Sequence, residues 1–152
     1  FAAADVAHLL IEGSERLLTH HNIPEPVDIL KAQYSVPFCV AIALHRDPDD
    51  PRSFDESAVQ DPAIRATAKS LELKQRAGEG SVRSSTVTVT LKDGRKVSKR
   101  RDSYKGMPAE PLTTEDLKRK FMLLTGGAGD AASAARFERL EKMVAAKTFS
   151  VA

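Results

Sequence analysis

The chain of 152 residues is long enough for one ordinary domain or for a small domain with an appendage. Its hydrophobic share of 41% and charged share of 29% are typical of soluble globular proteins, and no apolar run reaches the ~18 residues of a membrane-spanning helix. The net charge of +2 is too small to indicate a nucleic acid as partner, because nucleic-acid binders concentrate far more positive charge on one face.

The single cysteine, Cys39, excludes an intrachain disulfide, and its position in an apolar run predicts a buried, unreactive thiol. A reducing cytoplasm is therefore the expected location. The first residues lack the basic and apolar regions of a signal peptide. Because the sequence starts at Phe1 rather than at Met, a piece of a longer polypeptide is also an open interpretation.

The first part of the chain is predicted to hold a strand or helix end, a turn and a helix. Residues 6–11 form a short apolar run that fits either element, and residues 15–26 are polar and turn-like. Ser35 is predicted to cap a helix over residues 36–44, with Pro37 tolerated in its first turn. That helix has no polar face, so we expect it to be buried on all sides.

Two short helices follow, and then the spacing of the apolar residues changes from helical to alternating. Ser53 and Glu56 have the spacing of a capping box for the first helix. Asp61, followed by a proline, predicts the start of a second helix over residues 62–70. Leucines then alternate with charged residues over residues 71–73, which indicates a strand.

Residues 84–91 alternate between valine or leucine on one face and threonine on the other, and they predict a second strand. An Asp-Gly pair then signals a hairpin. A three-residue loop over residues 92–94, with its glycine left-handed, places Val97 opposite Val89. A two-residue turn would place Val97 opposite Thr90, on the polar face, so the longer loop is the expected one.

Two amphipathic helices are predicted at the end of the chain. Thr113 and Asp116 have capping-box spacing at the start of the first, and the glycine-rich residues 126–129 separate the two. Apolar residues recur at helical spacing in both: Leu117, Phe121 and Leu124, then Phe137, Leu140 and Val144. The elements together predict an α+β fold, in which an antiparallel sheet with packed helices precedes a two-helix tail.

Two of the four histidines, His20 and His21, are adjacent and form the main candidate for chemistry. Adjacent side chains on a regular element face different ways, which disfavours metal binding by both. In a turn, one imidazole can face a pocket and transfer a proton. A hydrogen-bonded turn without function is the equally open alternative. No metal is expected, because His8 and His45 lack metal-ligand spacing to the pair.

The remaining charged or glycine-rich segments have plainer interpretations. The basic run over residues 95–101 is typical of an edge strand protected by charge, and anion steering is its alternative. The acidic residues 47–50 do not match a calcium loop, and residues 126–129 do not match a phosphate loop.

Five short motifs nevertheless resemble the C-terminal part of the MmgE/PrpD family, which includes 2-methylcitrate dehydratase, cis-aconitate decarboxylase and iminodisuccinate epimerase. Their order and spacing make the resemblance specific. The motifs are HHNIPEP over residues 20–26, AQYSVPFCVA over 32–41, DPRSF over 50–54, VTLKDG over 89–94, and KGMPAEPL over 105–112, the last leading to Lys120-Phe121.

The resemblance implies a two-domain enzyme in which an α+β lid is inserted into a helical domain. Residues 1–108 would be the lid, and residues 109–152 the last helices of the helical domain. The family's active site lies between the two domains and acts on di- and tricarboxylates without a metal or organic cofactor. Most of its catalytic residues would precede Phe1, so we expect the chain alone to be inactive.

The site residues implied by the resemblance are few. His20 and His21 are the candidate catalytic residues, as proton donors. Tyr34, Lys105 and Gly106 are the candidate substrate-binding residues, with Lys105 attracting carboxylates and Gly106 allowing the backbone to approach the ligand closely.

The expected partners are a small-molecule carboxylate, an N-terminal helical domain of the same polypeptide and, as an option, a second copy in a homodimer. Neither a nucleic acid nor a membrane is expected. Two alternatives stay open: a stand-alone ligand-binding or protein-interaction module that reuses the lid fold, and a nucleic-acid accessory domain, which only the basic run supports.

Overall fold

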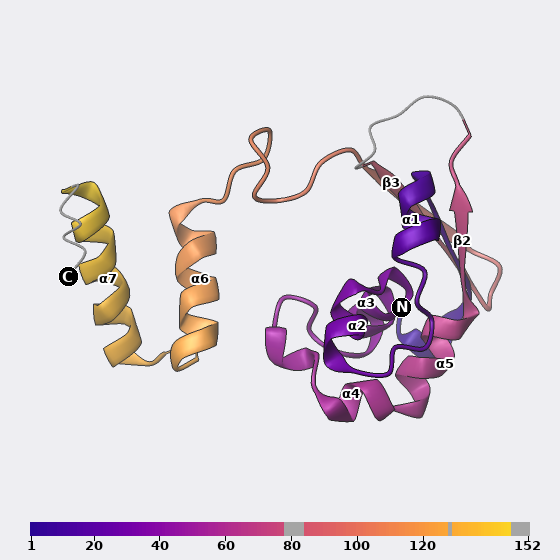
Figure 1. Ribbon diagram of the computed structural model, residues 1–152, viewed down its shortest axis with the longest axis horizontal. Helices are drawn as coiled ribbons and strands as arrows, with labels where there is room; N and C mark the ends of the chain where they lie inside the picture. Colours follow the sequence, from indigo (N-terminus) through magenta and orange to yellow (C-terminus); the bar gives the residue numbers. More distant parts are fainter. Residues whose placement is uncertain (78–83, 128, 147–152) are drawn as a thin grey trace. The chain divides into compact units, whose positions relative to one another are not determined.

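The computed structural model describes residues 1–77, 84–127 and 129–146. The chain divides into two compact units, Phe1–Ser103 and Tyr104–Ala152. The first unit contains a sheet and short helices, and the second contains two longer helices (Figure 1). The predicted division at residue 108, which concerns the parts of a longer enzyme, stays a prediction.

In its described residues, the first unit holds a four-stranded sheet of order β2-β1-β3-β4. The strands are β1 (Val6–Gly13), β2 (Leu71–Gln75), β3 (Ser85–Leu91) and β4 (Lys96–Arg101). The pairs β1–β3 and β3–β4 are antiparallel, as predicted, whereas β1 and β2 run parallel. The α+β class is confirmed. The sheet is mixed because helices connect β1 to β2, and such a crossover permits parallel pairing.

The connection between β1 and β2 carries most of the first unit's helices. Their bounds are α1 (Glu15–His20), α2 (Ile29–Tyr34), α3 (Val36–His45), α4 (Glu56–Gln60) and α5 (Pro62–Ser70). Two short 3₁₀ turns, Ala3–Asp5 and Pro51–Ser53, precede β1 and α4.

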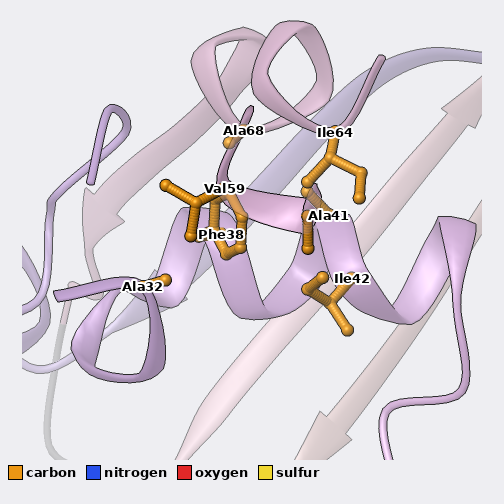
Figure 2. Close-up of a cluster of buried hydrophobic side chains, with 8 residues drawn as sticks. Ala32, Phe38, Ala41, Ile42, Val59, Ile64 and Ala68 are labelled. Atoms are coloured by element: carbon orange, nitrogen blue, oxygen red, sulfur yellow. The ribbon is translucent and has the colours of Figure 1, made fainter. Parts of the chain in front are cut away.

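The central helix α3 begins as predicted. The Ser35 hydroxyl accepts a hydrogen bond from the Phe38 N–H at 3.0 Å, and Pro37 lies in the first turn. One side of α3 contributes to a helical core with α2, α4 and α5 (Figure 2), which consists of Ala32, Phe38, Ala41, Ile42, Ala58, Val59, Ile64 and Ala68.

Another part of the α3 surface explains why the helix lacks a polar face. Val40 and Leu44 are partly buried against the sheet core, which consists of Leu9, Val89 and Leu91. The helix therefore lies between two apolar clusters. It is not buried all round, however, because Ala43 is exposed.

The hairpin adopts the predicted three-residue loop. Val89 pairs with Val97, and the Leu91 N–H donates to the Arg95 carbonyl at 2.8 Å. Gly94 has a φ of 87°, the left-handed conformation that this loop requires and that glycine adopts without strain.

Two local predictions are wrong. Residues 15–20 form helix α1 rather than a turn, because Leu17 and Leu18 are half-buried and α1 packs against β2. The cap of α4 is Asp55, whose carboxylate accepts from the Ala58 N–H at 2.7 Å. Ser53 is instead buried and donates to the Asp47 carbonyl at 2.6 Å.

The other predicted helix starts are confirmed. Asp61 accepts hydrogen bonds from two backbone N–H groups at the start of α5. In the second unit, Thr113 and Asp116 form the reciprocal capping box of α6 (Thr114–Thr125). The last helix is α7 (Ala131–Ala145), and the rings of Phe121 and Phe137 join α6 to α7 with 5.5 Å between their centroids.

A search of the described helices finds none with the length and apolar character needed to cross a membrane.

Candidate functional site

His20 is the last residue of α1, and its side chain is exposed. Its Nδ1 lies 2.7 Å from the Thr19 hydroxyl, which is also 3.2 Å from the Glu15 carbonyl oxygen. A hydroxyl has a single proton, so while Thr19 donates to Glu15, the His20 ring donates from Nδ1. In the neutral ring Nε2 then carries the lone pair.

His21 follows directly and is held more firmly. Its half-buried ring places Nδ1 at 3.1 Å from the Tyr34 carbonyl oxygen. A carbonyl oxygen can only accept, so Nδ1 carries the proton and Nε2 of the neutral ring can receive one. The structure therefore selects the tautomer of His21.

The backbone around His21 is tied to the junction of α2 and α3. The His21 carbonyl accepts from the Ile23 N–H at 3.1 Å and from the Val36 N–H at 3.0 Å. The Ser35 hydroxyl donates to the Ile23 carbonyl at 2.6 Å. These contacts fix the direction of the chain after the histidines. The backbone that carries the His21 imidazole is therefore held in place.

The same loop is anchored to α5 through Glu25. Its carboxylate lies 2.8 Å from the Lys69 ammonium and 3.2 Å from the Arg65 guanidinium. The hydrogen bond from Lys69, together with the charges of Lys69 and Arg65, holds the pKa of Glu25 below its ordinary value. Pro26, the next residue, is fully buried.

The two imidazoles form a small cluster on the first unit. Their ring centroids are 6.5 Å apart, and the ring planes are tilted by 47°. Within residues 1–77, 84–127 and 129–146, no group of three or more histidine, cysteine and acidic side chains could hold a metal ion. The chemistry that this arrangement supports is hydrogen bonding and proton transfer at the Nε2 atom of each ring.

Tyr34 contributes its carbonyl to His21, while its side chain is 62% exposed. Val27 and Leu30 are also exposed and precede Tyr34 at helical spacing. The three form an exposed apolar stripe that starts at Val27, just before the helix cap Asp28, and continues along α2. A groove of about 460 Å³ adjoins one end of the stripe and is lined by Val27, Asp28, Ile29, Leu30, Glu56, Val59 and Gln60.

The other two predicted substrate contacts lie in the second unit. The Lys105 ammonium forms an ion pair with Asp116, and the pKa of Asp116 lies far below its usual range because of Lys105 and of the hydrogen bonds from Thr113. Gly106 has a φ of 96°, and its N–H donates to the Glu110 carbonyl at 2.8 Å.

The structure thus brings His20, His21 and Tyr34 together in one unit, whereas Lys105 and Gly106, which are consecutive in the sequence, lie in the other. Whether any of them is catalytic or binds substrate stays a prediction. The positive charge of Lys105 is offset by Asp116, so a substrate carboxylate would compete with that contact.

Sequence reasoning missed the anchor at Glu25. The signal was present, because Arg65 and Lys69 are four residues apart and therefore share one face of α5. Two cations on one helix face favour an acidic partner. Only the fold, however, identifies that partner as a carboxylate 40 residues away from Arg65.

Comparison with known proteins supports the family resemblance. A family model described as MmgE/PrpD C-terminal domain matches residues 1–146, a range that contains every candidate site residue. This match confirms the family and the C-terminal position that the sequence motifs predicted. Among curated proteins, no match to the chain is found.

Proposed function

The chain belongs to the MmgE/PrpD family, and we propose that it supplies the lid-type, C-terminal part of a lyase or isomerase that acts on a di- or tricarboxylate, similar to 2-methylcitrate dehydratase. The match over residues 1–146 is the observation that carries the proposal. An N-terminal helical domain of the same polypeptide would supply the remaining catalytic residues, so the chain alone would be inactive.

The geometry of His21 supports a role in proton transfer. Dehydration or epimerisation next to a carboxylate requires that a proton move to or from carbon, and dehydration also requires an acid for the leaving hydroxyl group. His21 Nδ1 donates to the Tyr34 carbonyl, which leaves Nε2 for a substrate. A ring held in this way loses little conformational freedom when it reacts. His20 is the second candidate for the same role.

Lys105 and Gly106 are proposed to help hold the substrate. Gly106 has no side chain, so the backbone of this left-handed turn can approach a ligand closely while its N–H stays bonded to the Glu110 carbonyl. Lys105 would contribute positive charge by sharing its ammonium between Asp116 and the substrate.

One alternative is favoured by a specific observation. The exposed stripe of Val27, Leu30 and Tyr34, next to a groove of about 460 Å³, is also what a stand-alone ligand-binding or protein-interaction module would present.

The test compares the 152-residue chain with the complete product of the encoding gene. Turnover of 2-methylcitrate, cis-aconitate and related carboxylates is measured for both. We expect turnover only by a longer product that contains a helical domain. Activity of the chain alone would contradict its proposed inactivity. A complete product without a helical domain, or without activity on any of these acids, would favour the module.

A further inference from the structure

Strand β4 forms one edge of the sheet, and most of its side chains are cationic. In the order β2-β1-β3-β4, strand β4 pairs with β3 on one side, and in the described part of the chain no strand pairs with its other side. All six residues of β4 are exposed. An edge of this kind presents a row of backbone N–H and C=O groups to any extended chain that can approach it.

The register identifies which backbone groups point outward. Leu91 donates to the Arg95 carbonyl, and bonded and non-bonded pairs alternate along an antiparallel ladder. Val97 and Lys99, opposite Val89 and Val87, therefore bond toward β3. The N–H and C=O groups of Lys96, Ser98 and Arg100 consequently face the open edge.

The side chains of β4 set the charge of this edge. Lys96, Lys99, Arg100 and Arg101 are all cationic. Arg100 has a carboxylate partner, Asp102, at 2.7 Å. In the described ranges no ion pair is found for Lys96, Lys99 or Arg101, so their charges are available to a ligand. Pairing of two β4 strands would bring like charges together, which disfavours a second copy as the occupant.

An apolar hollow lies beside the edge. It has a volume of about 270 Å³ and is lined by Ser85, Val87, Val89, Val97, Lys99 and Arg101. The three valines provide an apolar floor, and the two cations lie along the edge strand. Val97 is 48% exposed, so part of that floor is uncovered.

We propose that β4 binds an extended acidic segment of a partner protein by strand addition. This surface goes beyond the proposed enzymatic function. Backbone groups of the partner would pair with Lys96, Ser98 and Arg100 at the edge, while its carboxylates meet the cations of β4. Partner side chains on the same face of the sheet as Val97 would cover the valine floor. Main-chain pairing supplies affinity, and alternate side chains supply selectivity.

The test uses the full 152-residue chain and a fluorescein-labelled peptide of about eight alternating Glu and Val residues. We expect saturable binding that weakens with added salt, because the charge contacts are exposed. The comparison peptide alternates Lys and Val and should bind at least about tenfold more weakly. If the Val side chains of the peptide cover the valine floor, its Glu side chains lie on the other face of the strand, beside Lys96 and Arg100. The double variant Lys96→Glu/Arg100→Glu should therefore reverse this preference.

Backbone pairing is tested separately from charge. Ser98→Pro removes one outward N–H without removing a ladder bond to β3, and proline is tolerated at such an edge position. Its matched control is Ser98→Ala, because both variants lose the hydroxyl contact with Thr88. We expect about tenfold weaker binding by Ser98→Pro alone. N-methylation of alternate peptide residues should weaken binding similarly, with the protein unchanged.

Four outcomes would overturn the proposal. These are no binding of the Glu-Val peptide, equal binding of the Lys-Val peptide, undiminished binding of the N-methylated peptide, and equally tight, salt-dependent binding of a single-stranded DNA oligonucleotide. The last would identify β4 as a general anion surface or a nucleic-acid contact.

Discussion

The Nδ1 atom of His21 lies 3.1 Å from the carbonyl oxygen of Tyr34, across 13 residues of sequence. This contact joins the end of α1 to the end of α2 and fixes both the tautomer and the direction of the imidazole. It also separates two properties of His21 that can be tested independently. One nitrogen stabilises the fold, and the other is available for chemistry.

The first prediction follows from that separation. In the complete enzyme, His21→Asn keeps a side-chain N–H near the position of Nδ1 but lacks a second ring nitrogen that can accept a proton. We expect kcat to fall by roughly 10²-fold if His21 is the general acid or base, with little change in stability. His21→Ala should lose similar activity and also about 1 kcal/mol of stability from the missing hydrogen bond. Steady-state kinetics and thermal unfolding provide the two measurements.

His20→Ala tests the second candidate in the same assay, and His45→Ala is the matched control. His45 is also exposed but bonds to the Thr67 hydroxyl at 2.9 Å, outside the loop of His20 and His21. It should keep kcat near that of the unmodified enzyme. If both His20→Ala and the His21 variants also keep unchanged kcat and KM, the histidine pair is structural.

The second prediction concerns the dependence of stability on pH. The pKa of Glu25 is lowered from its ordinary value of 4.5, first by the hydrogen bond from Lys69 and then by the nearby charges of Lys69 and Arg65. The ionised carboxylate therefore favours the folded state above that ordinary value. This contribution is lost as the pH falls through the lowered pKa.

Glu25→Gln should accordingly lower Tm near neutral pH, and the difference from the unmodified chain should shrink as the pH falls below 4.5. Thermal unfolding followed by circular dichroism at a series of pH values measures this effect. Glu138→Gln, at an exposed position on α7, is the control and should change Tm little. A constant Tm difference at every pH would show that Glu25 acts through packing rather than charge.

The third prediction compares two aromatic residues near the start of α3. Phe38 is fully buried in the helical core, with its ring centroid 6.4 Å from that of Phe54. Phe38→Ala should cost about 3–5 kcal/mol of unfolding free energy, because it leaves a cavity. Tyr34→Ala should cost less than about 1 kcal/mol, since its ring is 62% exposed and its backbone carbonyl still accepts from His21. Denaturant unfolding that gives equal costs would contradict this assignment of the core.

The fourth prediction concerns the second unit. Leu124 and Val144 are 54% and 58% exposed, although Phe121 and Phe137 pack against one another. Burying side chains of this size is worth ~1.5–3 kcal/mol each. We therefore expect the chain to self-associate with rising concentration, which would agree with the homodimer that the sequence leaves as an option.

Sedimentation velocity over a range of concentrations measures this association. The double variant Leu124→Glu/Val144→Glu should shift the chain toward monomer. Lys142→Glu, at an exposed polar position of α7, should leave the association unchanged. A monomer at every concentration would refute the prediction.

What could be predicted from the sequence is mostly local. Ser35, Asp61 and Thr113 were identified as helix caps because a cap and the N–H groups that it satisfies are only two or three residues apart. The hairpin register followed from a loop of three residues and from the alternation of valine and threonine. The family motifs belong to the same level, since they are contiguous stretches.

Tertiary structure decided the features that join distant segments. Leu17 and Leu18 became helical because they pack near β2, although the surrounding residues have the composition of a turn. The parallel pairing of β1 with β2 depends on the path of a long crossover, which no short window of sequence contains.

The candidate site divides in the same way. The sequence by itself determined that two imidazoles are adjacent, next to a proline-rich turn, in a chain of the MmgE/PrpD family. Only the tertiary structure decided that His21 is fixed by the Tyr34 carbonyl and that Glu25 anchors the loop to Lys69 and Arg65. The physical reason is that these hydrogen bonds form between groups 13 to 44 residues apart, whose meeting depends on the packing of α2, α3 and α5.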